Sequence, residues 1–180
     1  MKGYERFSDE ELAKMIVSEK DEIKKTYMIR SLSTDELMLK YAMQLDDYNK
    51  SCVTYSLHKL ENKIKIIETL QEERWLTAAL LEIPSNKYKL KFYYKINNLD
   101  YKTRILGSLD ANEQEIIDNV EYIKNEKEKA LIISKLNSIE AKKSFLNTIK
   151  DVNSKALIIM TLDDEKLKLE YIEKVTDKRN

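Results

Sequence analysis

Aliphatic residues recur along this chain at intervals of thirteen. The series runs from Leu32 to Val175, and nine of its eleven spacings are 13, while the other two are 12 and 14. Three and four residues before each member the chain is again mostly apolar, as expected for one face of a helix. We call the members the anchors: Leu32, Leu45, Leu57, Leu70, Ile83, Ile96, Leu109, Ile123, Leu136, Ile149, Leu162 and Val175.

One continuous helix cannot carry this repeat. At about 100° per residue, thirteen residues rotate a helix face by roughly 220°, so successive anchors would point in different directions. The helix must therefore break in every period, and residues that end or cap helices do follow the anchors. These residues are Asp46-Asp47, Pro84-Ser85, Asn97-Asn98, Asp110, Asn137-Ser138, Asp151 and Asp163-Asp164. Each period predicts a helix of about ten residues, which is too short to be stable without packing on neighbours.

The periods alternate between two types. In one type the residue six before the anchor is always small: Thr26, Ser51, Thr77, Thr103, Ala130 and Ala156. In the other type that position is mostly large and apolar, and a mostly charged residue follows it, as at Lys40, Lys65 and Lys91. Small residues allow helices to approach closely, whereas a charge must face water, so the two helix types belong to two layers.

The true repeat is thus a helical hairpin of about 26 residues, present six times from about residue 21 to residue 177. This pattern is typical of an all-α fold, specifically an α-solenoid. The chain resembles the HEAT-like and related two-helix repeat proteins in architecture, which implies a right-handed array and binding of a partner along an extended surface. We expect an N-terminal cap helix in residues 1–20, with Ser8 and Glu11 as a capping box, and the repeat array in residues 21–180.

Composition excludes several function classes. Two glycines leave no Gly-rich phosphate loop, and a single cysteine, Cys52, and a single histidine, His58, exclude disulfide frameworks and His-based metal sites. We therefore expect no enzyme activity, no metal and no cofactor. Residues 1–18 contain no apolar segment with a cleavage site, and no window is apolar enough to span a membrane, so we expect a cytoplasmic protein.

Lysine recurs seven residues before the anchors in nine of the twelve periods. It occurs in both helix layers, so it cannot line a single basic face. We interpret it as a structural residue whose stem packs on the adjacent helix and whose ammonium meets a turn carboxylate or a neighbour's last carbonyls. The nine are Lys25, Lys50, Lys63, Lys89, Lys102, Lys129, Lys142, Lys155 and Lys168.

Residues 86–104 form a basic stretch with six cations and one acid, which gives a net charge of 6 − 1 = +5. Phe92 and Tyr93 occupy core positions, which leaves three tyrosines free to stack on unpaired bases beside the lysines. This is the alternative function, a nucleic-acid-binding solenoid. The candidate residues here are Lys87, Tyr88, Lys91, Tyr94, Lys95 and Tyr101.

The preferred prediction is a non-enzymatic scaffold that binds a protein partner. Trp75, with Arg74 beside it, stands eight residues before Ile83, while Leu76, Ala79 and Leu80 already supply the core face of that helix. A partly exposed tryptophan is typical of protein interfaces, although packing against the preceding hairpin is the competing explanation. Arg74 and Trp75 therefore complete the set of candidate binding residues.

Overall fold

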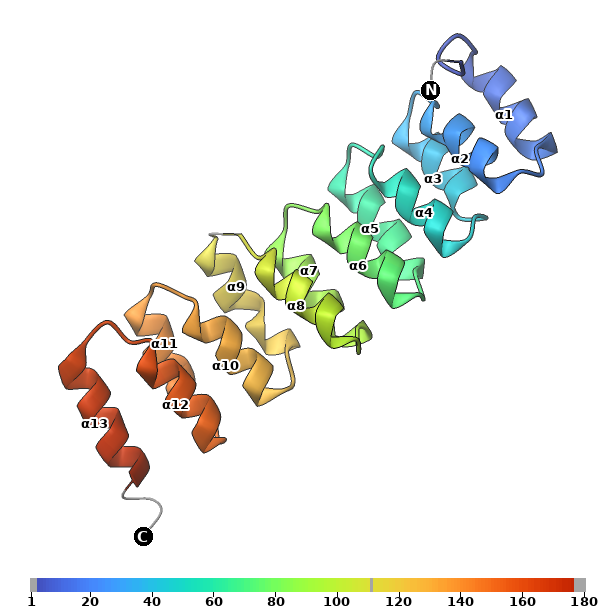
Figure 1. The fold of residues 1–180 in the computed structure, drawn as a ribbon. Helices are drawn as coiled ribbons and strands as arrows, with labels where there is room; N and C mark the ends of the chain where they lie inside the picture. Colours follow the sequence, from blue (N-terminus) through green and yellow to red (C-terminus); the bar gives the residue numbers. More distant parts are fainter. Residues whose placement is uncertain (1–2, 111, 177–180) are drawn as a thin grey trace. The chain divides into compact units, whose positions relative to one another are not determined.

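The computed structural model describes residues 3–110 and 112–176. Within these residues the chain forms thirteen α-helices, two short 3-10 helices and no strand (Figure 1). The predicted all-α fold is confirmed. The side chain of the last anchor, Val175, and residues 177–180 of the predicted array lie outside the described part of the chain.

The helices alternate as the two types of period predict. The odd-numbered helices are α1 (Asp9–Ser18), α3 (Asp35–Ala42), α5 (Leu60–Thr69), α7 (Asn86–Phe92), α9 (Glu113–Asn119), α11 (Ile139–Leu146) and α13 (Glu165–Thr176). The even-numbered helices are α2 (Glu22–Arg30), α4 (Asp47–Thr54), α6 (Glu73–Leu81), α8 (Leu99–Gly107), α10 (Glu126–Ser134) and α12 (Val152–Met160). The 3-10 helices η1 (Tyr93–Lys95) and η2 (Val120–Tyr122) follow α7 and α9.

The helices belong to two compact units. The first contains the chain up to Pro84 together with Ile96–Ile105, and the second contains Ser85–Lys95 and the chain from Leu106 onward. In the first unit α2 packs on α1, α3 and α4, while α4 packs on α3, α5 and α6. In the second, α7 packs on α9, and α10 packs on α11 and α12. Within each unit, therefore, helices contact the next helix and the next but one.

The anchors lie in the core of each unit. Every anchor from Leu32 to Leu162 is buried except Leu109, which is half-buried. They stand one to three residues after the end of a helix, and the N–H groups of most donate to the carbonyl three residues back, as Leu32 does to Ile29 at 3.2 Å and Ile123 to Val120 at 2.9 Å. Each such anchor closes its helix with a tightened last turn while its side chain enters the core.

Most of the polar residues after the anchors cap the following helices, as predicted, but Ser85 makes no side-chain cap of α7, and α9 is capped by Asn112 rather than by Asp110. The Asp46 carboxylate accepts the Asn49 N–H at 2.8 Å, and Asp151 accepts the Ser154 N–H at 2.8 Å. At the N-terminus, Ser8 and Glu11 form the predicted capping box of α1. These caps satisfy N–H groups that lack a partner within their own helix.

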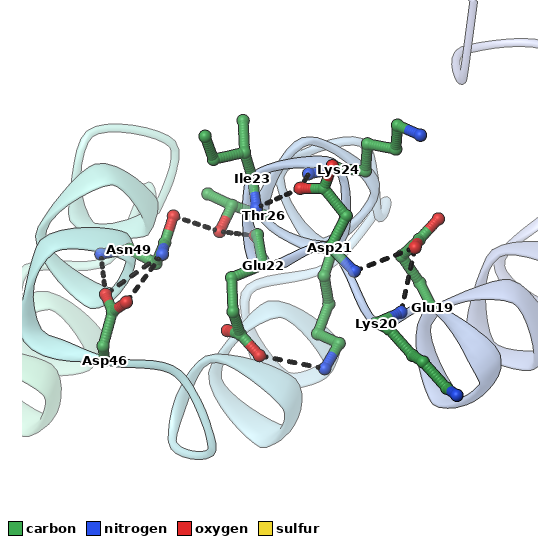
Figure 2. Close-up of polar contacts among 10 residues, drawn as sticks. Glu19, Lys20, Asp21, Glu22, Ile23, Lys24, Thr26, Asp46 and Asn49 are labelled. Carbon is green, nitrogen blue, oxygen red and sulfur yellow. Dashed lines mark hydrogen bonds and ion pairs between the residues drawn. The ribbon is translucent and has the colours of Figure 1, made fainter.

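The small residues of the even-numbered helices are buried where another even-numbered helix packs on them. Thr26, Ser51, Thr77 and Ala130 are each at most 4% exposed. Thr103 of α8 and Ala156 of α12 are exposed. Between α2 and α4 the contact is polar: the Thr26 hydroxyl donates to Asn49 Oδ1 at 2.8 Å, and the Asn49 amide donates to Asp46 (Figure 2).

A carboxylate at the start of a helix also bridges to a turn about 24 residues later. Asp47, the first residue of α4, accepts the N–H groups of Gln71 and Glu72 at 2.6 and 2.7 Å, in the turn before α6. Five other helices begin with an acid that does the same for the turn before the next helix but one. We call these six residues the bridging carboxylates: Asp9, Asp35, Asp47, Glu73, Glu113 and Glu126.

The recurring lysines include two that are buried. Lys89 and Lys142 are 4% and 5% exposed, and their ammonium groups donate to the carbonyls of Ser108 and Thr161 at 2.7 and 2.6 Å. Both carbonyls directly follow the end of an even-numbered helix. For these two residues the structural interpretation of the lysine is confirmed.

Within the described residues we find no helix that is both long and apolar enough to cross a membrane.

Candidate interaction surface

The predicted binding residues fall into separate groups. Arg74 and Trp75 lie on α6 and Tyr101 lies on α8, in the first unit, whereas the residues from Lys87 to Lys95 lie on α7 and η1, in the second.

Trp75 packs on the preceding even-numbered helix. Its ring centroid lies 4.8 Å from that of Tyr48 in α4, with the planes inclined at 54°, and the Arg74 guanidinium carbon lies 4.5 Å from the Trp75 centroid. Trp75 nevertheless remains half-buried and Tyr48 is 45% exposed. The pair is thus a packed aromatic cluster with a solvent-facing side, which is the arrangement typical of interface anchors.

The α7 group places lysines over aromatic rings. The Lys87 and Lys91 ammonium nitrogens lie 5.5 and 5.9 Å from the Tyr88 centroid, and Lys95 lies 5.5 Å from that of Phe92. Tyr94, in η1, is 66% exposed. Tyr88 and Tyr101 are half-buried, so Tyr94 is the most accessible of the three predicted stacking tyrosines.

One cation of the basic stretch does not contribute to its surface. Lys89 is buried, and its ammonium is taken up by the Ser108 carbonyl. Burial lowers the pKa of Lys89, and the nearby Asp110 and Glu115 carboxylates oppose that shift. Phe92 and Tyr93 are buried, as their positions predict. The charge of +5 counted along the sequence therefore overstates the charge available to a ligand.

A larger exposed apolar surface lies on the even-numbered helices of the first unit, and the sequence analysis identified only part of it. Ile23 and Tyr27 of α2 are 56% and 37% exposed, and Tyr48 and Tyr55 of α4 and its C-cap are 45% and 46% exposed. Together with Trp75 these side chains form what we call the aromatic face. In the sequence these residues are marked only by their positions, which lie two, five, eight or nine residues before an anchor.

The second unit repeats this feature with aliphatic residues. Leu131 of α10 and Leu157 and Met160 of α12 are 41%, 36% and 75% exposed. They stand five or two residues before their anchors, as Tyr27 and Tyr55 do in the first unit. Beside Leu131, a cavity of about 310 Å³ is lined by Leu106, Leu109, Asp110, Glu113, Ile116, Leu131, Ile132, Lys135, Leu136 and Asn137.

The odd-numbered helices present mainly charge to solvent. Nine and five residues before their anchors they carry exposed polar or charged residues: Glu36, Lys40, Glu61, Lys65, Lys87, Gln114, Asp118 and Glu140. The large apolar side chains that α3 to η2 expose on the odd-numbered side are Met43, Tyr94 and Tyr122, whereas α1 exposes Val17 and α13 exposes Leu169 and Ile172. The two helix types thus differ in surface chemistry as well as in packing.

The chemistry-bearing single residues do not form a catalytic cluster. The His58 ring is 81% exposed and its Nδ1 lies 3.0 Å from Asp35, whose carboxylate also holds two backbone N–H groups. Cys52 is a free, half-buried thiol. Among the described residues, no group of three or more His, Cys, Asp or Glu side chains is arranged to hold a metal ion.

Comparisons with protein-family models, curated proteins and solved structures give no match for this chain.

Proposed function

We propose that the chain is a non-enzymatic binding scaffold, in which helical hairpins stacked as an α-solenoid present the exposed face of the even-numbered helices to a protein partner. The period of 26 residues supports the solenoid, as does the packing of α2 on α4, α3 on α5, α4 on α6, α7 on α9 and α10 on α12. One observation carries the function: α2, α4, α10 and α12 expose large apolar side chains two, five or nine residues before their anchors, while the odd-numbered helices from α3 to α11 expose mainly charged and polar side chains.

The residue types of the exposed surface favour a protein as the ligand. Exposed apolar side chains scattered singly are normal, but a row that includes a tryptophan and three tyrosines on adjacent helices is typical of an interaction site. Tryptophan and tyrosine also contribute strongly when interface residues are truncated.

Affinity capture from cells that make the protein tests this proposal. A specific partner should be retained by the wild-type chain after nuclease treatment and lost with the double variant Tyr48→Ser and Trp75→Ser. The matched control is Tyr94→Ser, which removes a more exposed tyrosine from an odd-numbered segment. A partner that is retained equally by both variants, or that is released by nuclease, contradicts the proposal.

The second candidate function is binding of single-stranded nucleic acid by α7. Its support is the placement of Lys87 and Lys91 over Tyr88 and the exposure of Tyr94 in the 3-10 helix η1 that follows α7. Such binding should weaken steeply with salt, and Lys87→Glu with Lys91→Glu should weaken it for all sequences alike. Lys89 is unsuitable for this test, because its replacement would disturb the core. Absence of salt-sensitive oligonucleotide binding excludes this function.

A further inference from the structure

The cavity beside Leu131 lies where one anchor is incompletely covered. Every other anchor from Leu32 to Leu162 is at most 4% exposed, whereas Leu109 is half-buried. Leu109 and Leu131 both line the cavity, which has a volume of about 310 Å³. Protein interiors are close-packed, with few voids larger than a water molecule. The cavity therefore marks space beside the core that the chain does not fill with its own side chains.

All residues that line the cavity belong to the second unit. They lie at the end of α8 and in the turn after it, in the first half of α9, and in the second half of α10 and the segment that follows. Four of them are buried and aliphatic: Leu106, Ile116, Ile132 and Leu136. Four are exposed: Asp110, Leu131, Lys135 and Asn137. The cavity thus has an aliphatic base and a mouth that carries polar groups.

The Glu113 carboxylate orients one of these polar groups. Its Oε1 accepts the Asn137 backbone N–H at 2.5 Å and the Asn137 Nδ2 at 2.7 Å. An ionised carboxylate only accepts hydrogen bonds, so the amide nitrogen of Asn137 faces Glu113, and the amide Oδ1 has no partner within residues 3–110 and 112–176. The Lys135 ammonium likewise makes no hydrogen bond or ion pair in this part of the chain. An acceptor and a donor at the mouth are therefore available to a ligand.

Charges of both signs border the cavity. Among the lining residues Asp110 and Glu113 are negative and Lys135 is positive, which gives a net charge of 1 − 2 = −1. Two lysines lie near the acids: burial lowers the pKa of Lys89 and of Lys142, and the carboxylates of Asp110 and Glu113, respectively, oppose these shifts. Two further acids act on the same lysines, Glu115 on Lys89 and Asp163 on Lys142.

This arrangement of charges disfavours an ionic ligand. An anion would meet the carboxylates of Asp110 and Glu113, whereas a cation would meet the Lys135 ammonium, and contacts between like charges are costly. An ion would also lose its hydration at the aliphatic base without gaining a polar partner there. The site therefore favours a ligand without net charge.

We propose that this cavity binds a small, uncharged and mainly apolar molecule, whose apolar body packs on Leu106, Leu109 and Ile132 and whose polar end lies at the mouth. That end can donate to Asn137 Oδ1 or accept from the Lys135 ammonium. An apolar cavity of about 150 Å³ holds benzene, so this one has room for about two fused rings or an aliphatic body of similar size. Ligand sites commonly combine an apolar lining with a few polar groups that fix orientation. The inference is independent of the scaffold proposal, because it does not involve the aromatic face.

Three naphthalene derivatives that differ in charge test the proposal: uncharged 2-naphthol, anionic 2-naphthoate and cationic 2-naphthylmethylammonium. Their binding to the full chain can be measured by equilibrium dialysis at neutral pH. We expect 2-naphthol to occupy a single saturable site, at least about tenfold more tightly than either ion. Because the ligand binds the folded state, saturating 2-naphthol should also raise the thermal midpoint seen by circular dichroism.

Substitutions that fill the cavity locate the site. Leu131→Trp places a larger side chain at the mouth and should weaken 2-naphthol binding about tenfold or more. Leu157→Trp makes the same change five residues before the anchor of α12, at a position that is 36% exposed and does not line the cavity, so it should change binding less than about twofold. Lys135→Trp fills the mouth from a second exposed position and should act as Leu131→Trp does. The circular dichroism spectrum of each variant shows whether it keeps the helical fold.

Three results would overturn the proposal. The first is that none of the three probes binds saturably. The second is that an ionic probe binds as tightly as 2-naphthol, which contradicts the uncharged ligand class. The third is that folded Leu131→Trp and Lys135→Trp bind 2-naphthol as the wild-type chain does, which places the probe elsewhere.

Discussion

Asp35 and His58 are joined across one repeat: the Asp35 carboxylate accepts the His58 backbone N–H at 3.0 Å and lies 3.0 Å from the ring Nδ1. The same carboxylate accepts the Lys59 N–H at 2.7 Å. Asp35 is buried, whereas the His58 ring is exposed. One acid at the start of α3 thus accepts hydrogen bonds from the backbone N–H groups of the turn that leads into α5.

Asp35→Asn should lower the free energy of unfolding by about 2–3 kcal/mol at neutral pH. Burial by itself would raise the pKa of Asp35, but the His58 and Lys59 N–H groups, with His58 Nδ1 and the Asn62 amide, outweigh it and hold the pKa well below its usual range. Such a group stabilises the fold fully above its unfolded pKa of about 3.9, and that contribution is lost as pH falls below it. Urea titrations at neutral and acidic pH should therefore show the difference between variant and wild type shrinking in acid.

Two control variants make this prediction specific. Glu61→Gln removes an exposed acid near the start of α5 and should change stability little at either pH. His58→Ala keeps the backbone N–H that Asp35 accepts, so it should cost much less than Asp35→Asn. An equal loss for His58→Ala would mean that the imidazole, and not the turn backbone, is the partner that matters.

Lys89→Ala should destabilise the protein by about 1–3 kcal/mol, because it leaves the Ser108 carbonyl without its donor and removes a buried stem. Lys87→Ala, two residues away on the exposed side of α7, should change stability by no more than about 0.5 kcal/mol. Thermal or urea unfolding of the two variants checks the difference. Equal effects would contradict the separate roles of the two lysines.

The sequence predicts the helices and most of the core because burial repeats locally. An anchor such as Leu136 and the apolar pair Ile132-Ile133 identify the buried side of α10 without knowledge of any other helix. The bridging role of Asp47 is not predictable in this way, because it depends on which turn lies beside the start of α4, about 24 residues further along the chain. A recurring acid in the first helical position was its only signal.

The exposed aromatic residues were recognised only in part from the sequence for the same reason. Trp75 and Tyr94 are conspicuous as residue types, and both retain solvent exposure. Ile23 and Tyr27 are unremarkable in the sequence, and they become part of a surface only when α2 and α4 pack together. Lys89, conversely, does not contribute to the basic surface of α7, because its ammonium donates to the Ser108 carbonyl after α8.

Ala130→Leu should destabilise the second unit by about 1–3 kcal/mol through overpacking, since Ala130 is fully buried where α10 packs on α12. Ala156→Leu makes the same change at the equivalent position of α12, where the residue is exposed, and should stay within about 0.5 kcal/mol of wild type. Circular dichroism melts of the two variants provide the measurement. If both are destabilised alike, the close approach of α10 and α12 is not what requires a small residue.

Ile133→Ala should lower the stability of the second unit by about 2–5 kcal/mol, because Ile133 is fully buried in α10. Trp75, in the first unit, reports on that unit alone, whereas circular dichroism reports on the helices of both. In a repeat protein, stability is approximately a sum of local and nearest-neighbour contributions. We therefore expect the circular dichroism transition of the variant to shift and broaden in urea while the Trp75 fluorescence midpoint moves little.

The reciprocal variant, Val53→Ala in the buried part of α4, should move the Trp75 fluorescence midpoint directly. Coincident shifts of both probes in Ile133→Ala would instead mean that the two units unfold as one cooperative structure.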